Sequence, residues 1–247
     1  MSDLILSCKN LNKAYDGMPV IEDVSLELFR GEIVAILGKS GSGKSTLFNV
    51  LAGLDSADSG EVERHARVGY MMQKDLLLDW KTVLDNIALP LILRSASKQE
   101  ARDKAGEFLP IFGLSGLENR WPATLSGGQR QRCALLRTWL YSQELMLLDE
   151  PFSGLDALTR EGLYEWLLDH KEELGLSILL ITHSIEEALS LANRIYVLQG
   201  ELPARLLASI DIPQVEGSSD VDHIMERENL RRQISSALFS CHNSFVI

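Results

Sequence analysis

Residues 33 to 54 carry the pattern that most constrains the fold of this chain. The stretch from Gly38 to Thr46 matches the phosphate-loop pattern G-x-x-x-x-G-K-[ST] without a mismatch. The apolar run Ile33–Leu37 precedes it, as expected of a buried strand, and apolar residues recur at helical spacing from Leu47 to Leu54. Strand, glycine loop and helix in this order predict an α/β fold around an anion-binding loop. A glycine-rich turn that binds nothing is the alternative, and the flanking strand and helix argue against it.

Each residue type in this loop suits phosphate chemistry. Glycines at 38, 41 and 43 let the backbone curl so that its N–H groups converge on phosphate oxygens, and the following helix points its positive end at the same anion. Lys44 supplies a positive charge for the β- and γ-phosphates, and Ser45 offers a hydroxyl to Mg²⁺. The predicted phosphate cradle consists of Gly38, Lys39, Ser40, Gly41, Ser42, Gly43, Lys44, Ser45 and Thr46.

Length and charge narrow the class of protein. The chain has 247 residues, and since single α/β domains commonly reach about 250, one two-lobed domain and two domains are equally compatible with it. The formal net charge of −11 argues against a binder of nucleic acid or of anionic lipid, because both would repel the protein. Any role at a membrane must therefore run through a protein partner.

Cysteine spacing and hydropathy indicate a cytosolic protein. Cys8, Cys133 and Cys241 stand far apart without a C-x-x-C pair, so neither a disulfide framework nor a zinc site is expected, and we interpret them as small apolar fillers. The chain opens without a basic and apolar leader. No uncharged apolar run reaches the ~18 residues of a membrane span.

Three buried apolar runs end in polar side chains. In α/β sheets, ligands bind at the carboxyl ends of the strands, so these side chains are candidates for one site. A lone histidine at such a position is alternatively a structural residue. The runs and their polar residues are Val68–Met72 with Gln73, Leu145–Leu148 with Asp149 and Glu150, and Ser177–Thr182 with His183.

Two apolar features leave alternatives open. Tyr15 precedes the turn signal Asp16-Gly17, and it either packs on the surface or offers a stacking platform to a base. The cluster that follows Gln73 is either core or an exposed patch that awaits a partner. This cluster consists of Leu76, Leu77, Leu78 and Trp80.

A second glycine motif, Leu125 to Gln129, opens a predicted helix. Adjacent glycines at a helix start form an anion-binding nest, and the helix amino terminus favours phosphate. Arg130, Arg132 and Arg137 follow on this helix, and the usual meaning of such a basic run is a solvated face.

Local patterns predict the other elements. The apolar run Leu4–Leu6 begins a predicted strand, and alternating apolar residues indicate another at Val24–Leu28. Residues 84–140 are predicted to be mainly helical. Ser97 and Glu100 form a capping box for a helix whose apolar face runs from Ala101 to Phe112, with Pro110 kinking it or ending it early. Shorter signals predict a strand at Gly60–Val62 and a last clear strand at Ile195–Leu198. Near the end of the sequence, they predict a linker at Glu216–Asp220 and a short helix marked by Leu230, Ile234 and Leu238.

Residues from about 4 to 210 together resemble the nucleotide-binding subunit of an ABC transporter. The pentapeptide Leu125-Ser126-Gly127-Gly128-Gln129 makes the resemblance specific, because kinases and GTPases with a phosphate loop lack it. The resemblance implies an α/β P-loop NTPase cassette with a RecA-like lobe, an antiparallel β subdomain and a helical signature subdomain. The ABC ATPase domain would span 1–212, with its helical subdomain at about 84–140, and 213–247 would form the linker and the short C-terminal helix.

The resemblance also implies a role for each matching residue. Tyr15 would stack on adenine, and the loop from Gly38 to Thr46 would cradle the phosphates of ATP. The catalytic residues would be Glu150 as general base, His183 at the γ-phosphate and Gln73 as the sensor of Mg²⁺. The metal would be held by Ser45, Gln73 and Asp149. In a second subunit, Ser126, Gly127, Gly128 and Gln129 would face the γ-phosphate, with Asp156 at the dimer seam.

Residues 72 to 86 are similar to those of importers for nitrate, sulfonates, taurine and the pyrimidine precursor of thiamine, although Asp79 stands where that group usually has proline. The implied assembly is a homodimer of ATPase subunits with transmembrane permease subunits and a solute-binding protein, peripheral on the cytoplasmic face of the membrane and without nucleic acid. One alternative is a non-transport ABC ATPase acting on the ribosome or DNA, although such proteins generally carry two cassettes or a long coiled-coil insert. Another is a binding-only regulatory module, against which Glu150 and His183 argue.

Overall fold

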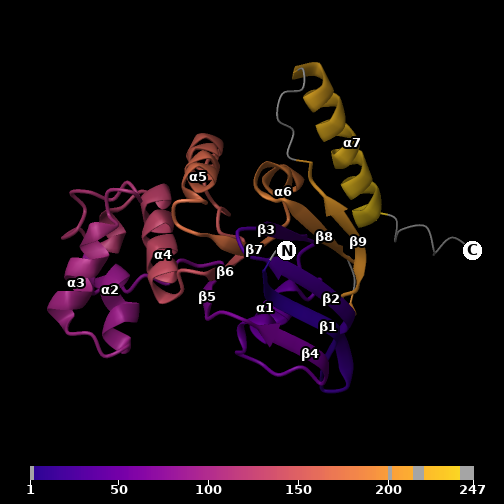
Figure 1. The fold of residues 1–247 in the computed structure, drawn as a ribbon, viewed down its shortest axis with the longest axis horizontal. Coiled ribbons are helices and arrows are strands. Elements are labelled where there is room, and N and C mark those ends of the chain that lie inside the picture. The colour runs from indigo at the N-terminus through magenta and orange to yellow at the C-terminus, as the bar shows by residue number, and fades with distance from the viewer. Residues whose placement is uncertain (1–2, 200–201, 214–219, 240–247) are drawn as a thin grey trace, which may run out of the picture. The chain divides into compact units, whose positions relative to one another are not determined.

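The computed structural model describes residues 3–199, 202–213 and 220–239. The chain forms two compact units (Figure 1). Unit 1 comprises Met1–Ala66 and Ser177–Ile247, and unit 2 comprises Arg67–Leu176. Each unit contains both strands and helices, so the α/β class is confirmed.

The first sheet of unit 1 is antiparallel, in the order β2-β1-β4. β1 (Leu4–Tyr15) and β2 (Met18–Phe29) form a hairpin closed by Asp16 and Gly17. The φ angles of these two residues, 50° and 77°, are both left-handed, as a two-residue hairpin turn of the primed type requires. β4 (Ser59–Arg64) pairs with the other edge of β1. The predicted strands are therefore present, and the first two are longer than their sequence signals.

The second group of strands in unit 1 is mixed. β3 (Ile33–Leu37) lies between β7 (Ser177–Thr182) and β8 (Arg194–Leu198) and pairs parallel with both. All five residues of β3 are fully buried, as its continuous apolar run predicts. Since the parallel register sets Leu37 opposite Thr182, the chain leaves both strands at the same edge.

Two features at the carboxyl end of unit 1 differ from the predictions. β8 contains the last clear strand predicted, and a further strand that was not predicted, β9 (Leu206–Asp211), pairs antiparallel with it. α7 (Asp220–Phe239) has 20 residues and is longer than the short helix expected. It packs against α6 (Ile185–Leu191) and β8 and buries Ile234 and Leu238. Most of the predicted linker, with Cys241, lies outside the described residues.

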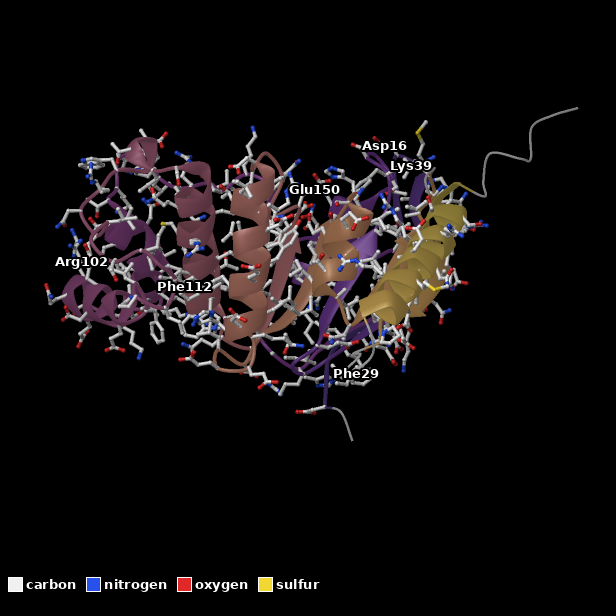
Figure 2. The ribbon with its side chains drawn as sticks, turned by 90° about the horizontal axis from the view of Figure 1, so that it is seen from above. Asp16, Phe29, Lys39, Arg102, Phe112 and Glu150 are labelled. Carbon is white, nitrogen blue, oxygen red and sulfur yellow. The ribbon has the colours of Figure 1, made fainter. Side chains whose placement is uncertain are left out.

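Unit 2 combines one parallel strand pair with the helices between and after its strands. β5 (Val68–Met71) pairs with β6 (Leu145–Asp149). The helices are α2 (Val83–Leu93), α3 (Lys98–Glu107), the 3-10 turn η1 (Pro122–Thr124), α4 (Gly127–Tyr141) and α5 (Ala157–His170). Phe112 joins α4 and α5: its ring lies 4.6 Å from Trp166 of α5 and 6.2 Å from Trp139 of α4, centroid to centroid. Figure 2 labels Phe112.

The capping box of α3 is present as predicted, because the Ser97 hydroxyl accepts from Glu100 N–H and the Glu100 carboxylate accepts from Ser97 N–H. The helix ends at Glu107, before Pro110, so Phe112 reaches the core from a turn and not from a helix face.

Burial raises the pKa of the Cys8 thiol to about 11 and that of Cys133 to about 12, which fits their expected role as apolar fillers. In the part of the chain that the structure describes, no helix is both long and apolar enough to cross a bilayer.

Candidate functional site

The glycine loop of unit 1 runs from the end of β3 to the start of α1 (Lys44–Ala52). Gly41 and Gly43 have φ angles of 80° and 85°, which favour glycine. A Cβ at Gly43 would also lie 3.0 Å from the carbonyl oxygen of Val20, so the backbones approach closely there. A Cβ at Gly41 would meet nothing within 4 Å, which leaves that side of the loop open. The loop is therefore a curled backbone with one free face.

Lys44 lies inside this curl. Its side chain is buried, and Nζ donates to the carbonyl oxygens of Gly38 at 2.8 Å and Lys39 at 2.5 Å. Ser42 Oγ is buried and has no hydrogen-bond partner among the described residues. Ser45 is exposed in the first turn of α1, and Lys39 is half-buried on the rim (Figure 2). A buried ammonium, an orphaned hydroxyl and a helix amino terminus on one concave loop fit a polyphosphate.

His183 and Tyr15 lie in the same unit as this loop. His183 directly follows β7 and is exposed, at the edge where Gly38 follows β3. Tyr15 ends β1 and keeps 43% of its surface exposed, so it is not a core residue. Unit 1 thus brings the phosphate loop and His183 to one sheet edge, with Tyr15 on the neighbouring hairpin.

Unit 2 brings the predicted glutamine and carboxylates together. Gln73 Nε2 donates to Glu150 Oε2 at 3.2 Å. Asp149, the last residue of β6, is only 8% exposed. Burial, with the charge of Asp149 as a second cause, raises the pKa of Tyr70 to about 12, so this phenol stays protonated beside the carboxylate.

Glu150 has a left-handed backbone with φ of 45°. A non-glycine residue in this region is strained, and such strain persists where the surrounding structure holds it, often at functional sites. Figure 2 labels Glu150, which directly follows β6.

The second glycine motif begins α4. Ser126 is the N-cap, and its side chain and that of Gln129 form a capping box: Gln129 N–H donates to Ser126 Oγ at 3.3 Å, and Ser126 N–H donates to Gln129 Oε1 at 3.0 Å. A Cβ at Gly127 would lie 3.0 Å from Leu155 Cδ2, and one at Gly128 would lie 2.6 Å from Thr159 Cγ2. These glycines therefore let α4 approach the start of α5 closely.

Asp156 is the N-cap of α5 and accepts from the Thr159 N–H at 3.0 Å and from the Thr159 hydroxyl at 2.7 Å. These two hydrogen bonds hold the pKa of Asp156 below its ordinary value. Its side chain is exposed, so it is a helix cap on the surface of unit 2.

The basic run on α4 is not a solvated face at Arg130 and Arg137, contrary to the sequence-based interpretation. Arg130 Nε and Nη2 donate to the two carboxylate oxygens of Asp75, at 2.9 and 3.1 Å. Arg137 donates to the carbonyl oxygens of Asp75 and Leu76, the latter at 2.8 Å. The two arginines hold the segment that follows Gln73. Nothing in the sequence spacing pairs them with it.

Asn86 of α2, another residue that the sequence did not single out, is fully buried and fixes the same segment. Its Oδ1 accepts from Leu78 N–H at 2.7 Å, and its Nδ2 donates to the carbonyl oxygens of Leu78, Lys81 and Thr82 at 3.0 to 3.1 Å.

The four residues of the apolar cluster after Gln73 differ in burial, and Leu78 is half-buried. Leu76 and Trp80 are 52% and 73% exposed, whereas Leu77 is 7% exposed and belongs to the core. The chain turns at Leu76, whose φ is 47°, so neighbouring leucines point in different directions. The patch interpretation is therefore wrong for Leu77 and fits Leu76 and Trp80.

An α/β unit with a phosphate loop, together with a carboxylate pair and a capped glycine motif, defines the class of nucleotide-hydrolysing cassettes. The sequence matches the family described as ABC transporter over residues 21–153. It is 42% identical over 240 residues to the formylaminopyrimidine import ATP-binding protein ThiZ of Halalkalibacterium halodurans, covering 95% of this chain and 96% of the relative. It is 38% identical to the aliphatic sulfonates import ATP-binding protein SsuB 1 of Shouchella clausii, covering 94% and 92% of the two chains.

Solved structures of ABC transporter proteins are similar to this chain as well. The dimeric bacterial ABC transporter cassette MJ0796 superposes with a TM-score of 0.72 at 30% identity, covering 85% of this chain and all of that one. A subunit of a putative metal-chelate type ABC transporter in an inward-facing conformation has a TM-score of 0.79 at 25% identity, covering 96% and 89%.

The chain belongs to the ABC transporter family and is one of its ATP-binding subunits, an ATPase. The expected function, the ATP-hydrolysing subunit of an ABC importer, is confirmed at this level, and these relatives give no support to action on the ribosome or DNA.

Proposed function

We propose that this chain energises import of a small solute of the sulfonate, nitrate, taurine or thiamine-pyrimidine type through a separate permease. One observation carries the catalytic part: Gln73, which follows β5, donates a hydrogen bond to Glu150, whose backbone is strained. This contact ties the predicted sensor of Mg²⁺ to the predicted general base. The importers of formylaminopyrimidine and of aliphatic sulfonates among the relatives support the solute class.

ATP would bind with its phosphates on the loop from Gly38 to Thr46. The loop's free face at Gly41 leaves room for them, and Lys44 would turn from its carbonyl partners toward the β- and γ-phosphates. The exposed ring of Tyr15 would stack on adenine.

Each of the three proposed ligands offers the kind of hard oxygen that Mg²⁺ prefers. Ser45 offers a hydroxyl, Gln73 an amide oxygen and Asp149 a carboxylate. The bound ion would supply charge neutralisation at the phosphates. The hydrogen bond from Gln73 Nε2 to Glu150 leaves the amide oxygen of Gln73 available for such a ligand.

Hydrolysis needs an oriented water and stabilised charge at the γ-phosphate, and no covalent help from the protein. Glu150 would accept the proton of the attacking water. His183, exposed at the sheet edge of the phosphate loop, would contact the γ-phosphate.

The active unit would be a homodimer closed on two ATP molecules. Ser126, Gly127, Gly128 and Gln129 start α4, and the capping box uses the N–H groups of Ser126 and Gln129 but not those of Gly127 and Gly128. These groups would meet the γ-phosphate held by the other subunit, with Asp156 at the seam.

Leu76 and Trp80 are exposed apolar side chains on the segment that follows Gln73, and they would dock the permease on the cytoplasmic face of the membrane. A solute-binding protein would complete the importer. The net charge of −11 supports partners that are neither nucleic acid nor anionic lipid.

Transport by the full complex tests this proposal. The chain, its permease and its solute-binding protein are reconstituted in liposomes, and uptake of a labelled alkanesulfonate, taurine, nitrate and formylaminopyrimidine is compared with ATP inside. ATP-dependent uptake of one of these, absent with Glu150→Gln, is expected. Uptake of none of the four by a complex that hydrolyses ATP would overturn the solute class.

A further inference from the structure

Asp55 links the Tyr15 ring to the helix that begins at the phosphate loop. It lies shortly after the end of α1, and its Oδ2 accepts a 2.5 Å hydrogen bond from the phenol hydroxyl of Tyr15. Its other oxygen, Oδ1, accepts from Lys13 Nζ at 3.1 Å and from Ser56 N–H at 2.7 Å. Both oxygens of this carboxylate are therefore engaged, and one of them holds the end of the aromatic side chain.

Lys13 completes the arrangement from β1. Its side chain is buried, and Nζ also donates to the carbonyl oxygen of Ser56 at 2.8 Å. The same nitrogen lies 5.0 Å from the centroid of the Tyr15 ring, within the range of a cation–π contact. Tyr15 is thus held at its hydroxyl by Asp55 and contacted at its ring by Lys13, and it still exposes 43% of its surface.

We propose that Lys13 and Asp55 are positioning residues for the nucleotide base, which fix the Tyr15 ring in its stacking orientation before ATP binds. The inference rests on the proposed stacking of adenine on Tyr15. An exposed tyrosine that is free to rotate loses rotamer freedom when a base stacks on it, and this loss weakens binding. A ring that is already held has less freedom to lose. The contact between Asp55 and Tyr15 thereby contributes to ATP affinity without touching the nucleotide.

The ionisation states support the contact. The hydrogen bond to Asp55 is the main cause that raises the pKa of Tyr15, as expected of a phenol that donates to a carboxylate. The hydrogen bonds from Tyr15 and then from Lys13 lower the pKa of Asp55, as expected of an ionised acceptor.

A structural role in the loop is the competing explanation, and Asp58 provides the matched control. Asp58 accepts from Ala14 N–H at 2.6 Å and lies 3.7 Å from Lys13 Nζ, in the same loop as Asp55. Asp58→Asn removes the same charge from the same loop and leaves the hydrogen bond from Tyr15 to Asp55 in place.

The test is equilibrium titration of the full chain with a fluorescent N-methylanthraniloyl derivative of ATP. Tyr15→Phe keeps the ring and removes the anchor, and Asp55→Asn weakens the acceptor. Each should weaken binding about three- to tenfold, the effect of immobilising one side chain. The effects of the two changes should be less than additive in the double variant, because both act on the hydrogen bond between Tyr15 and Asp55. KM for ATP should rise with kcat unchanged, and Asp58→Asn should bind as the unmodified chain does.

Tyr15→Ala separates this inference from the function on which it rests. Weak binding by Tyr15→Ala, together with unchanged affinity of Tyr15→Phe, would overturn the anchor and leave the stacking role intact. Unchanged affinity of Tyr15→Ala, with binding lost in Lys44→Ala, would overturn both. Tyr15→Phe retains the ring, so it carries the test if the loop variants unfold.

Discussion

Arg130 of α4 donates to both carboxylate oxygens of Asp75, through Nε at 2.9 Å and through Nη2 at 3.1 Å. Asp75 lies two residues after Gln73 and directly before Leu76, so this ion pair joins the start of α4 to the segment between the predicted sensor of Mg²⁺ and the predicted docking surface. A bidentate pair of this kind fixes orientation as well as distance. It therefore couples the second glycine motif to that segment inside one unit.

Asp75→Asn should lower the free energy of unfolding by about 1–3 kcal/mol, because Arg130 loses its ionised partner in a partly buried position. Burial alone raises the pKa of Asp75, but the hydrogen bonds from Arg130 and from Leu77 N–H outweigh it and hold that pKa below the ordinary 3.8. The stabilisation is thus present above pH 3.8 and is lost as the pH falls through the lowered pKa.

Urea unfolding between pH 3 and 7 measures this difference. Glu107→Gln is the control, because its pair with Lys104 is exposed on both sides and should contribute little. Equal stabilities of Asp75→Asn and the unmodified chain at pH 7 would contradict the role of the pair.

Gly128→Ala should destabilise the chain by about 1–3 kcal/mol through overpacking. The new Cβ would lie 2.6 Å from Thr159 Cγ2, and the hydrogen bond from the Thr159 hydroxyl to Asp156 keeps that side chain from rotating away. Thr159→Ser removes the methyl group, so adding it to Gly128→Ala should restore most of the lost stability.

Gly162→Ala is the control: its new Cβ, in the middle of α5, would meet nothing within 4 Å, so it should instead stabilise the chain by about 0.5–1 kcal/mol. Thermal unfolding of Gly128→Ala, Thr159→Ser, their double variant and Gly162→Ala measures these changes in stability. Equal effects of the two glycine substitutions would refute the packing explanation.

The parts of the fold that the sequence predicted are those whose signals are local. The apolar run of β3, the glycines of the loop and the capping box of α3 each involve residues a few positions apart. β9 was missed because it is a six-residue edge strand whose apolar residues, Leu206, Leu207, Ala208 and Ile210, do not alternate regularly with polar ones. The contact of Arg137 with Leu76 spans 61 positions, so the local pattern could only suggest a solvated face.

The same limit applies to the candidate site. Strand ends predicted Gln73, Asp149 and Glu150, because parallel strands deliver their last residues to one edge. The burial of Leu77 beside exposed Leu76 could not be predicted, since it depends on the left-handed φ at Leu76 and not on periodicity. The role of Asp55 could not be predicted from local patterns either, because its partner Tyr15 is 40 positions away.

Leu76→Ala with Trp80→Ala should release the chain from vesicles that contain its permease, with little change in thermal stability, because both side chains are exposed. Leu77→Ala is the contrasting variant and should cost about 2–5 kcal/mol of stability, because Leu77 is buried. Membrane sedimentation beside thermal unfolding, with and without ATP, separates the two effects. A double variant that still sediments with the permease would rule out this docking surface.

Mixing Ser126→Arg chains with Lys44→Ala chains should restore part of the ATPase activity, because in a composite dimer each defect lies in a different half of the site. Ser97→Arg controls for the lost helix cap, since Ser97 makes the same capping box on α3 away from the glycine motif. Fluorescence transfer between labelled chains monitors subunit exchange, and phosphate release is measured once exchange is complete. Mixtures that exchange and remain inactive would contradict the dimer arrangement.

The central claim is that Glu150 activates water at a site where ATP binds independently of it. Glu150→Gln keeps the shape and the acceptor for Gln73 Nε2, but it removes the group that takes the proton. We expect phosphate release to fall about 10²- to 10⁴-fold while ATP affinity stays within about twofold. Lys44→Ala should lose affinity, and Glu161→Gln, an exposed change on α5, should alter neither. Single-turnover phosphate release at saturating Mg-ATP is the direct measurement: a large loss of rate with intact binding is the predicted result, and a near-normal rate in Glu150→Gln would contradict it.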